Sequence, residues 1–583
     1  MNSHRLRTGG RIDRERPLTF TFDGATYTGY QGDTLASALL ANGVRTVAES
    51  VAHGRPRGVY AAGVDEPNAL VKLHAGGPGP AGPGESMAQS TVTELYDGMC
   101  ATPLRGRGQL DPEDPADPGH NDTMHAHCDV LVIGAGPAGL AAARTAAATG
   151  ARVVLLDEQP EMGGSLLGTR ERIADRPPLE WVRRTLTELA GRTETVLLPR
   201  TTALGCYDHN YVVAAERRTG AGGPTGRLWL IRARRIVLAT GAHERPLLFA
   251  DNDRPGVMLA GAARTYANRY GVLAGRHAVV CTNNDSAYAA ALELADAGVR
   301  ITRLVDARDR VPPYWVRLCA DRGIDVSTGH VVVGSRGSDG SGGVTAARVA
   351  PRAAVSPEGV AAVADIACDL LLVSGGWNPA AQLHTQSGGR MRYDERLCCH
   401  VPDGPDPRRR VTGAARGLGR LGDCLADGVA TGADATADLG LTAGQAPLPP
   451  GAWEPETVPP LWPLRAHPAA DPAAQYVDLQ RDATLAHIQR AVGAGMRSVE
   501  HIKRYTTIGT AHDQGRTSGV TAAAATACAL GVPVGDLGPS THRPPYTPVP
   551  FALLAGRARG RLHDPVRTTP IHRWHAARGA VFE

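Results

Sequence analysis

Residues 128–158 read CDVLVIGAGPAGLAAARTAAATGARVVLLDE, and this stretch decides the fold. The apolar run 129–133 predicts a buried strand, which a glycine turn joins to an Ala-rich helix and then to a second strand. Gly134 permits the tight turn, Gly136 lets backbone N–H groups approach a pyrophosphate, and Gly139 lets the helix lie close to the strand. The pyrophosphate is expected at the positive N-terminus of that helix. The stretch therefore predicts a βαβ unit that binds a dinucleotide.

The second strand of this unit ends in two acidic residues, Asp157 and Glu158. An acidic residue about 20 positions after the first glycine is placed to bind a ribose 2′-hydroxyl, and Asp157 meets that spacing. The contacts predicted for this unit are Gly134, Gly136, Pro137, Ala138, Gly139, Asp157 and Glu158.

Two later segments resemble those of flavoproteins with two dinucleotide-binding domains. MGGSL (162–166) follows the acidic pair, and RIVLATGAHERP (235–246) reads as a buried strand that ends in an ATG turn. In such flavoproteins a later aspartate binds the flavin ribityl chain, but VTGAARG (411–417) has Ala414 at the matching place. The missing carboxylate leaves NAD and FAD as alternatives for this unit. The two segments add four predicted cofactor contacts, which are Gly164, Ser165, Thr240 and Gly241.

A second βαβ pattern covers residues 277–308, HAVVCTNNDSAYAAALELADAGVRITRLVDAR. Its turn carries Thr282 and Asn284 where related reductases have glycines, and side chains there crowd a pyrophosphate. We therefore expect this unit to be structural rather than a site for NAD(P)H. Together the two units predict an α/β fold with tandem Rossmann-like dinucleotide-binding domains.

The 583-residue chain divides into several expected parts. The boundaries are 1–105 for a ferredoxin-like β-grasp domain, 106–270 and 376–440 for two parts of the first dinucleotide-binding domain, 271–375 for the second, 441–475 for a Pro-rich linker, 476–535 for a small helical cluster-type domain, and 536–583 for a C-terminal extension.

Composition excludes several classes of protein. The net charge of +4 is spread thinly, which argues against a nucleic-acid partner. The chain shows no apolar signal-peptide core and no apolar run of about 18 residues, so we expect a cytoplasmic protein without a membrane span. None of the 10 cysteines lies in a CxxC pair, and no metal site is expected. Only two lysines occur, Lys72 and Lys503, so each marks a position worth noting in an Arg-rich chain.

Two segments have the plan of iron–sulfur modules without the cysteines. In RGVYAAGVDEPNALV (57–71), the C-x4-C-x2-C spacing of plant-type ferredoxins falls on Ala61, Glu66 and Ala69, so no [2Fe–2S] cluster is expected there. Residues 477–518 resemble the bacterioferritin-associated-ferredoxin type of cluster domain. Its four cysteine positions correspond to Asp478, Gln480, Asp513 and Ser518, within a frame of Lys503, Arg504, Thr506, Gly509, Gln514 and Gly515.

Long segments of the chain resemble the alpha subunit of heterotetrameric sarcosine oxidase. They include GGRIDRERPLTFTFDGATYTGYQGDTLASALLANGV, RPRGVYAAGVDEPNALV, GAGPAGLAAA, CTNNDSAYAAALELADAGV, VSGGWNP (373–379), RSVEHIKRYTTIGTAHDQGRTSGV and RPPYTPVPFALLAGR (543–557). In that family the alpha chain continues into a folate-binding aminomethyltransferase domain. This sequence ends at HRWHAARGAVFE, about where that domain would begin, so transfer of a one-carbon unit to folate is not expected.

The resemblance implies a subunit of a flavin-dependent oxidase of amines or amino acids. NAD or FAD is implied on the first dinucleotide-binding domain, FAD and the amine site in a beta-type partner, and FMN at the interface, where O2 is reduced to H2O2. A gamma chain and a zinc-binding delta chain are further implied partners. The candidates for the FMN interface are Lys503, Arg504, Tyr505, Thr506, Gly509 and Gln514, and the catalytic candidates in this chain are Lys503, Thr506 and Thr507.

Two other hypotheses remain open from the sequence. The chain could be a stand-alone NAD(P)H- and FAD-dependent oxidoreductase, or a non-catalytic scaffold that holds NAD and docks a partner oxidase.

Overall fold

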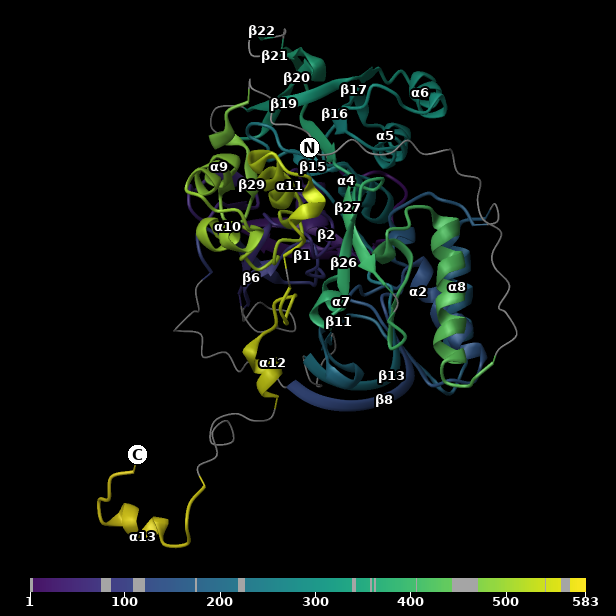
Figure 1. Cartoon of the computed structure of the whole chain (residues 1–583), viewed down its shortest axis with the longest axis vertical. Coiled ribbons are helices and arrows are strands. Elements are labelled where there is room, and N and C mark those ends of the chain that lie inside the picture. The colour runs from purple at the N-terminus through teal and green to yellow at the C-terminus, as the bar shows by residue number, and fades with distance from the viewer. Residues whose placement is uncertain are drawn as a thin grey trace.

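The computed structural model contains several β-sheets with helices packed beside them (Figure 1). It describes residues 4–74, 85–108, 121–173, 176–218, 226–337, 342–356, 359–360, 363–404, 406–442, 470–540, 542–556 and 567–582. Most of the expected Pro-rich linker, residues 443–469, lies outside this range. No helix in the part of the chain that the structure describes is long and apolar enough to cross a membrane.

The N-terminal module, residues 4–108, is a five-stranded sheet with one helix against it. The strand order is β2-β1-β7-β5-β6, and β1 runs antiparallel to β2 but parallel to β7. The β1–β2 turn at Asp23-Gly24 has positive φ at both residues, as the sequence predicts for a hairpin. The elements are β1 (Asp13–Phe22), β2 (Ala25–Gln31), α1 (Leu35–Ala41), β3 (Ala48–Glu49), β4 (Pro56–Arg57), β5 (Leu70–Leu73), β6 (Glu85–Gln89) and β7 (Met99–Pro103).

The first unit contains the sheet β10-β9-β8-β13-β12-β11, with β28 also paired to β13. Its strands are β8 (Asn121–Ile133), β9 (Val153–Leu156), β10 (Thr195–Leu198), β11 (Thr201–Tyr207), β12 (Tyr211–Arg217), β13 (Gly226–Leu238) and β28 (Arg409–Val411). Its helices are α2 (Pro137–Ala148), α3 (Pro178–Ala190) and α8 (Leu421–Ala437). Helices α2 and α8 lie side by side on one face (Figure 1), and a Cβ on Gly428 would stand 2.3 Å from the Ala138 carbonyl oxygen. Glycine there lets α8 hold α2 closely against the sheet.

The second unit is an all-parallel sheet in the order β15-β24-β16-β17-β18, next to a three-stranded antiparallel sheet. The elements of the unit are β15 (Val257–Leu259), α4 (Ala260–Thr265), β16 (His277–Thr282), α5 (Ser286–Asp296), β17 (Arg300–Asp306), α6 (Pro313–Ala320), β18 (Val326–Thr328), β19 (His330–Gly337), β20 (Val344–Pro351), β21 (Val355–Ser356), β22 (Gly359–Val360), β23 (Ala364–Ala367) and β24 (Leu370–Ser374). Its buried residues form one continuous core with those of the N-terminal module, including Phe20, Leu39, Val279 and Leu372.

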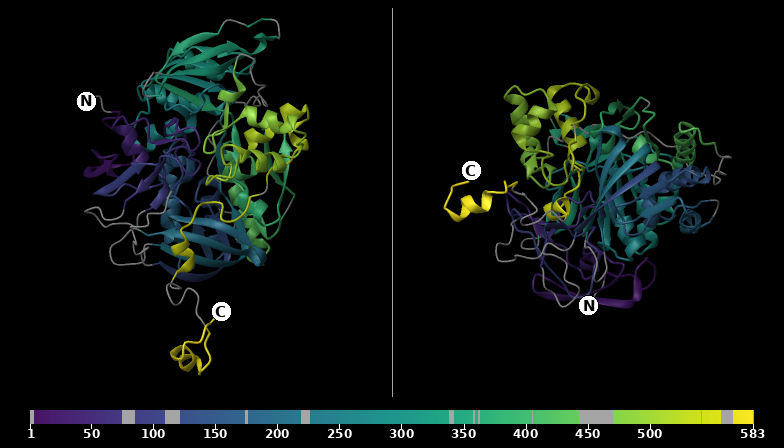
Figure 2. Two further views of the ribbon diagram at one scale, coloured as in Figure 1. Left: turned by 90° about the vertical axis from the view of Figure 1, so that its left-hand side faces the viewer. Right: turned by 90° about the horizontal axis from the view of Figure 1, so that it is seen from below.

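The chain returns to the first unit through β14 (Ala242–Glu244), β25 (Trp377–Pro379), α7 (Gln382–Gln386), β26 (Arg390–Asp394) and β27 (Cys399–Asp403). The C-terminal module, residues 470–540, contains β29 (Tyr476–Asp478), β30 (Ala483–Thr484), α9 (Leu485–Gly493), α10 (Val499–Thr506) and α11 (Gly519–Leu530). A strap, residues 542–556, then crosses the sheet of the first unit and ends in α12 (Phe551–Ala555); Figure 2 shows it in yellow. Helix α13 (His572–Ala577) projects away from the rest (Figure 1).

The expected fold class is confirmed. A ferredoxin-like module precedes two Rossmann-like units, and a helical module follows them. The expected boundaries between these parts stay predictions.

Candidate functional site

The glycine turn of the first unit has the geometry that a pyrophosphate needs. Gly134 has φ of +101°, and a Cβ on Gly139 would stand 1.8 Å from the Gly134 carbonyl oxygen, so neither position accepts a side chain. Gly136 caps α2, which begins at Pro137. A Cβ on Gly136 would meet nothing nearer than Gly164 Cα at 3.8 Å. Only the backbone of Gly164 lies this close to Gly136 among the described residues, so no side chain crowds this position and the N–H groups of α2 can bind an anion.

Some of the other predicted cofactor contacts lie near this turn. Gly164 packs directly against it, because a Cβ on Gly164 would stand 2.6 Å from Gly136 Cα. Gly241 has φ of +76° and open space where a side chain would be, and Ser165 is exposed. The Thr240 hydroxyl donates to the Ala380 carbonyl at 2.7 Å, so it ties β13 to the returning chain. The structure thus brings Gly164 and the glycine turn together, whereas Thr240 has a structural partner.

The two acidic residues after β9 have different roles. One Asp157 oxygen accepts from Ala135 N at 2.6 Å and the other from Gln159 N at 2.8 Å, so this carboxylate holds the glycine turn. No described residue donates a hydrogen bond to the Glu158 carboxylate. Burial raises the pKa of Glu158 to about 7, and the guanidinium of Arg516 opposes that shift. Of the two carboxylates, that of Glu158 is therefore the one left available to a ligand, whereas the spacing argument favours Asp157. Which of them contacts a ribose stays a prediction.

Near Ala414, where related flavoproteins have an aspartate, a carboxylate from helix α8 binds the chain instead. The Asp427 carboxylate of α8 accepts from Gly413 N at 2.9 Å and from the Thr412 hydroxyl at 2.7 Å. It also accepts from Arg416 at 2.6 Å. A carboxylate does lie near the 411–417 stretch, but its oxygens are used by that stretch, so Ala414 still leaves NAD and FAD open.

In the second unit the corresponding turn is filled by its own side chains. Asn284 Nδ2 donates to the carbonyl and the hydroxyl of Ser374, both at 3.1 Å, and its Oδ1 accepts from the Ser286 hydroxyl at 2.6 Å. The strand-end acid Asp306 binds Arg308 at 2.7 Å and the Tyr288 hydroxyl at 2.8 Å. The polar groups that would meet a dinucleotide are satisfied within the protein.

The loop of the N-terminal module where a cluster would lie is organised by one carboxylate. Glu66 is fully buried, and its two oxygens accept four backbone N–H groups, from Tyr60, Ala61, Asn68 and Ala69, at 2.7–2.9 Å. Burial raises its pKa to about 7, against the effect of these four donors. Two of the donors, Ala61 and Ala69, stand where plant-type ferredoxins have cysteine ligands, and Glu66 stands at the remaining cysteine position. The Glu66 carboxylate thus satisfies the backbone N–H groups of the loop from its centre.

The cysteine positions of the C-terminal module form a buried polar network. Asp478 accepts from Gly509 N at 2.7 Å and lies 3.4 Å from the Ser518 hydroxyl. Burial, together with the neighbouring Asp513 carboxylate, raises the pKa of Asp478 to about 6. Gln480 contacts His512, whose pKa burial lowers to about 4. Within the described residues, no group of three or more His, Cys, Asp or Glu side chains has an arrangement that could hold a metal.

The candidates for the FMN interface lie on or after α10, and they face in different directions. Thr506 is buried and donates to Ile502 O at 2.6 Å, and Gly509 is buried with φ of +70°. Lys503 Nζ donates to the Ser540 hydroxyl at 3.0 Å. Arg504 and Tyr505 are exposed, the latter by 51%. Thr507 ends the helix with φ of +62° and is also exposed.

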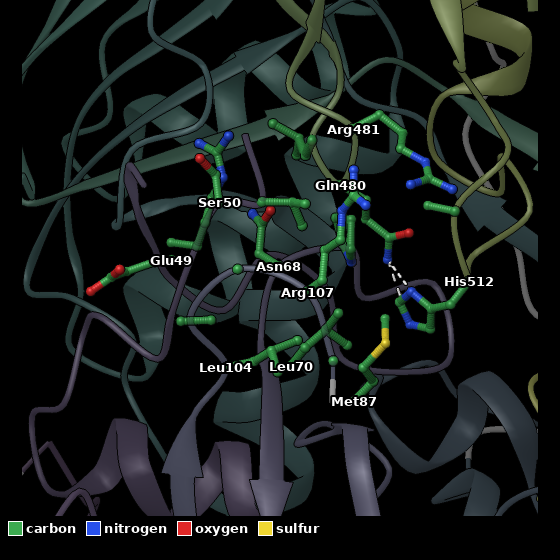
Figure 3. Close-up of a pocket in the computed structure, with 18 of the residues that line it drawn as sticks. Glu49, Ser50, Asn68, Leu70, Met87, Leu104, Arg107, Gln480, Arg481 and His512 are labelled. Carbon is green, nitrogen blue, oxygen red and sulfur yellow. Dashed lines mark hydrogen bonds between the residues drawn. The ribbon is translucent and has the colours of Figure 1, made fainter. Parts of the chain in front are cut away.

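A pocket of about 370 Å³ lies between the N-terminal and C-terminal modules (Figure 3). Leu70, Leu104 and Met87 form an apolar side, while Gln480 and His512 lie opposite (Figure 3). Among the FMN-interface candidates, Gln514 lines it. The pocket thus adjoins both loops that stand where clusters would be, because Pro67 and Asn68 also line it.

Sequence reasoning missed a set of polar residues near Glu158 and the ATG turn that come from three parts of the chain. Arg217 donates to the Glu158 carbonyl at 3.1 Å and to the Val92 carbonyl at 3.0 Å. His243, two residues after the ATG turn, has its Nδ1 4.0 Å from an Asp65 oxygen. Arg516 lies in the loop before α11. No motif spacing relates these residues, since only tertiary packing brings them together.

Comparison with known proteins agrees with this architecture. The family model for the 2Fe-2S iron-sulfur cluster binding domain matches residues 15–105, the pyridine nucleotide-disulphide oxidoreductase model matches 128–403, and the sarcosine oxidase A3 domain model matches 473–557. The crystal structure of L-proline dehydrogenase from P. horikoshii has a TM-score of 0.70 at 22% identity, covering 94% of this chain and 99% of that one. At this identity the likeness shows the fold alone.

Three curated relatives carry the name sarcosine oxidase subunit alpha, two from Corynebacterium and one from Rhizobium. The protein from Corynebacterium sp. (strain P-1) is 46% identical over 591 residues, which is 98% of this chain and 60% of that protein. The protein from Rhizobium meliloti (strain 1021) is 38% identical over 644 residues, covering 100% of this chain and 62% of that protein. The chain thus spans about 60% of the length of these relatives.

Proposed function

Because the chain is a homologue of sarcosine oxidase subunit alpha along nearly its whole length, we propose that it is the large subunit of a heteromeric flavin-dependent oxidase of amines or amino acids. Its own tasks are to hold NAD or FAD on the first unit and to form one wall of an FMN site shared with a beta-type, FAD-bearing subunit. The flavins supply the redox chemistry, in which the amine is oxidised and O2 is reduced to H2O2.

The contrast between the two Rossmann-like units carries this proposal. The turn of the first unit is open at Gly136 and has an unengaged acid at Glu158, whereas Asn284 and Arg308 satisfy the second. A reductase that takes hydride from NAD(P)H needs a second open site next to its flavin. Among the described residues, the first unit alone has such a site, which favours one bound dinucleotide and electrons that arrive from a partner.

In the first unit, each group has a defined task toward the dinucleotide. The N–H groups at the start of α2 bind the pyrophosphate, and the dipole of the helix favours its negative charge. Gly164 keeps the opposite wall close without a side chain. The Glu158 carboxylate accepts hydrogen bonds from the ribose hydroxyls, while Asp157 holds the turn in place.

The solvent exposure of the side chains on and after α10 narrows the list of residues that can contact FMN. Arg504, Tyr505 and Thr507 can contact a ligand from α10, and Gln514 can do so from the pocket. Lys503 can offset negative charge on a reduced flavin or its phosphate if its ammonium leaves Ser540. Thr506 and Gly509 act by shaping the loop, because both are buried and bonded within the module. Gamma and zinc-binding delta chains and a cytoplasmic location are part of the same proposal.

Co-purification tests the proposal. The chain is expressed alone and together with its candidate FAD-oxidase partner, each preparation is denatured, and the released nucleotides are identified by chromatography. We expect one NAD or FAD from the chain alone, and FMN, FAD and amine-dependent H2O2 only from the complex. Bound FAD with NADH oxidation by the isolated chain would establish the stand-alone oxidoreductase instead. A complex whose activity and second flavin do not depend on this chain would establish the scaffold.

A further inference from the structure

The strongest unassigned feature is a buried arginine of the C-terminal module that contacts two other parts of the chain. Arg516 is only 5% exposed. Nη1 donates to the Val64 carbonyl at 3.1 Å, Nη2 donates to the Thr547 hydroxyl at 2.8 Å, and the guanidinium lies 4.1 Å from the centre of the Tyr546 ring. One side chain therefore joins the N-terminal module, the C-terminal module and the strap.

This arginine has no direct ion-pair partner among the described residues. No described carboxylate lies within ion-pair distance of Arg516, and its Nε is buried without a hydrogen-bond partner. Burying a guanidinium without an anionic partner is unfavourable. Other buried arginines in the chain do have such partners, for example Arg308 with Asp306 and Arg57 with Asp482. Arg516 lacks such a carboxylate, so an oxygen-rich ligand next to it would offset the cost of its burial.

Neighbouring contacts place Arg516 near the proposed dinucleotide site. It donates to the Val64 carbonyl, and an oxygen of the next residue, Asp65, lies 4.0 Å from Nδ1 of His243, two residues after the ATG turn. Consistently, the guanidinium of Arg516 opposes the effect of burial on the pKa of Glu158. The strap runs over the same end of the first unit: Tyr546 N donates to Leu204 O of β11 at 3.4 Å, and Leu553 packs on Leu204 and Leu228. Charged groups of the N-terminal module, the first unit and the C-terminal module thus act on the Glu158 carboxyl.

We propose that Arg516 closes the ribose end of the dinucleotide site, so that the bound dinucleotide and the C-terminal module stabilise each other. The inference rests on the proposed dinucleotide site of the first unit. Glu158 accepts from the ribose hydroxyls, and Arg516 donates to the ribose or pyrophosphate oxygens on the opposite side. Because coupling between two equilibria is reciprocal, a ligand held by Arg516 also favours the closed position of the module that carries it. The dinucleotide then acts as a structural tie between the first unit and the segment proposed to face FMN.

Two substitutions of Arg516 test this role in the full chain, with NAD+ and FAD titrated separately. Arg516→Met keeps the apolar stem, and Arg516→Lys keeps the charge but cannot reach several partners at once. Loss of a charge-assisted contact should weaken binding of the dinucleotide about 10- to 100-fold. The matched control is Arg308→Met, because Arg308 is also 5% exposed but belongs to the second unit. It should lower stability without changing the dissociation constant.

A second measurement separates positioning of a ligand from a purely structural role. Hydrogen exchange is followed across residues 513–518 and the strap, with and without the dinucleotide. We expect the dinucleotide to slow exchange there in the wild type and to lose this effect in both Arg516 variants. Unchanged affinity in the two variants, or no protection in the wild type, would overturn the inference while leaving the dinucleotide site intact. A wild-type chain that binds neither NAD+ nor FAD would instead remove the proposed function as well.

Discussion

The two Rossmann-like units share one topology but differ at the turn that follows their first strand. In the first unit, the atom nearest to a Cβ on Gly136 would be Gly164 Cα, at 3.8 Å. No described residue donates a hydrogen bond to the Glu158 carboxylate. In the second unit Asn284 fills the turn and Arg308 binds the strand-end acid Asp306. The same backbone plan therefore supports two states, one open to a ligand and one closed by its own side chains.

This difference teaches that a βαβ fold carries binding only where its polar groups are left unsatisfied. Helix N-termini always present free N–H groups. A side chain such as Asn284 can stabilise a turn at such an end, and the site is then lost without loss of the fold. Substitutions in one unit, compared with matching substitutions in the other, test whether this difference decides binding.

The largest effect is expected for Gly136→Val. A valine side chain would occupy the space next to the N-terminus of α2, so affinity for the dinucleotide should fall at least about 100-fold, or roughly 2.7 kcal/mol. The fold should persist, because Gly136 has φ of −74°, which valine can adopt. Isothermal titration with NAD+ and FAD gives the affinity, and circular dichroism checks the fold. Retained affinity would place the dinucleotide elsewhere.

The mirror-image change, Asn284→Ala, should affect stability rather than binding. The Ser374 and Ser286 groups lose their buried partner, so the free energy of unfolding should fall by about 1–3 kcal/mol. Denaturant titration measures this change. The amount of dinucleotide per chain should stay the same, whereas a second bound nucleotide in the variant would mean that Asn284 alone keeps the second unit closed.

Glu158→Gln should weaken dinucleotide binding about 10-fold, since an amide replaces a charged acceptor. The pKa of Glu158 near 7 gives the sign of a pH effect: protonation below that value removes the negative charge of the acceptor, so the wild type should bind more weakly at pH 6 than at pH 8. The variant should lose this dependence. Asp306→Asn in the second unit is the control and should leave binding unchanged at both pH values, so an equal loss there would contradict the assignment of Glu158.

The same comparison shows how far the sequence can predict the site. The glycine pattern correctly indicated the strand, turn and helix of the first unit, and Thr282 and Asn284 correctly indicated a different turn in the second. The choice between Asp157 and Glu158 was beyond sequence reasoning, because successive side chains at a strand end point to opposite faces. Which one faces a ligand depends on where the backbone N–H of Ala135 lies.

Contacts between distant parts of the chain were also beyond sequence reasoning. The absence of cysteines at positions 61, 66 and 69 could be read directly. That the Glu66 carboxylate would accept four backbone N–H groups follows only from the closed loop. Likewise, Arg516 meets Val64 across 452 positions of sequence, a relation that no local pattern encodes.

The smallest effect is expected for Lys503→Ala, which lies outside both units. Its ammonium is already bonded to Ser540, which in turn donates to Glu500 at 2.6 Å, so its loss should reduce FMN retention in the complex only about two- to fivefold. Flavin release on gel filtration measures the effect, and Lys72→Ala, at the one other lysine of the sequence, is the matched control. The dinucleotide of the first unit should remain at full occupancy. If the variant lost the dinucleotide and kept FMN, the helix α10 surface would belong to the first unit's site, and the separation between an open unit and a distinct FMN wall would have to be abandoned.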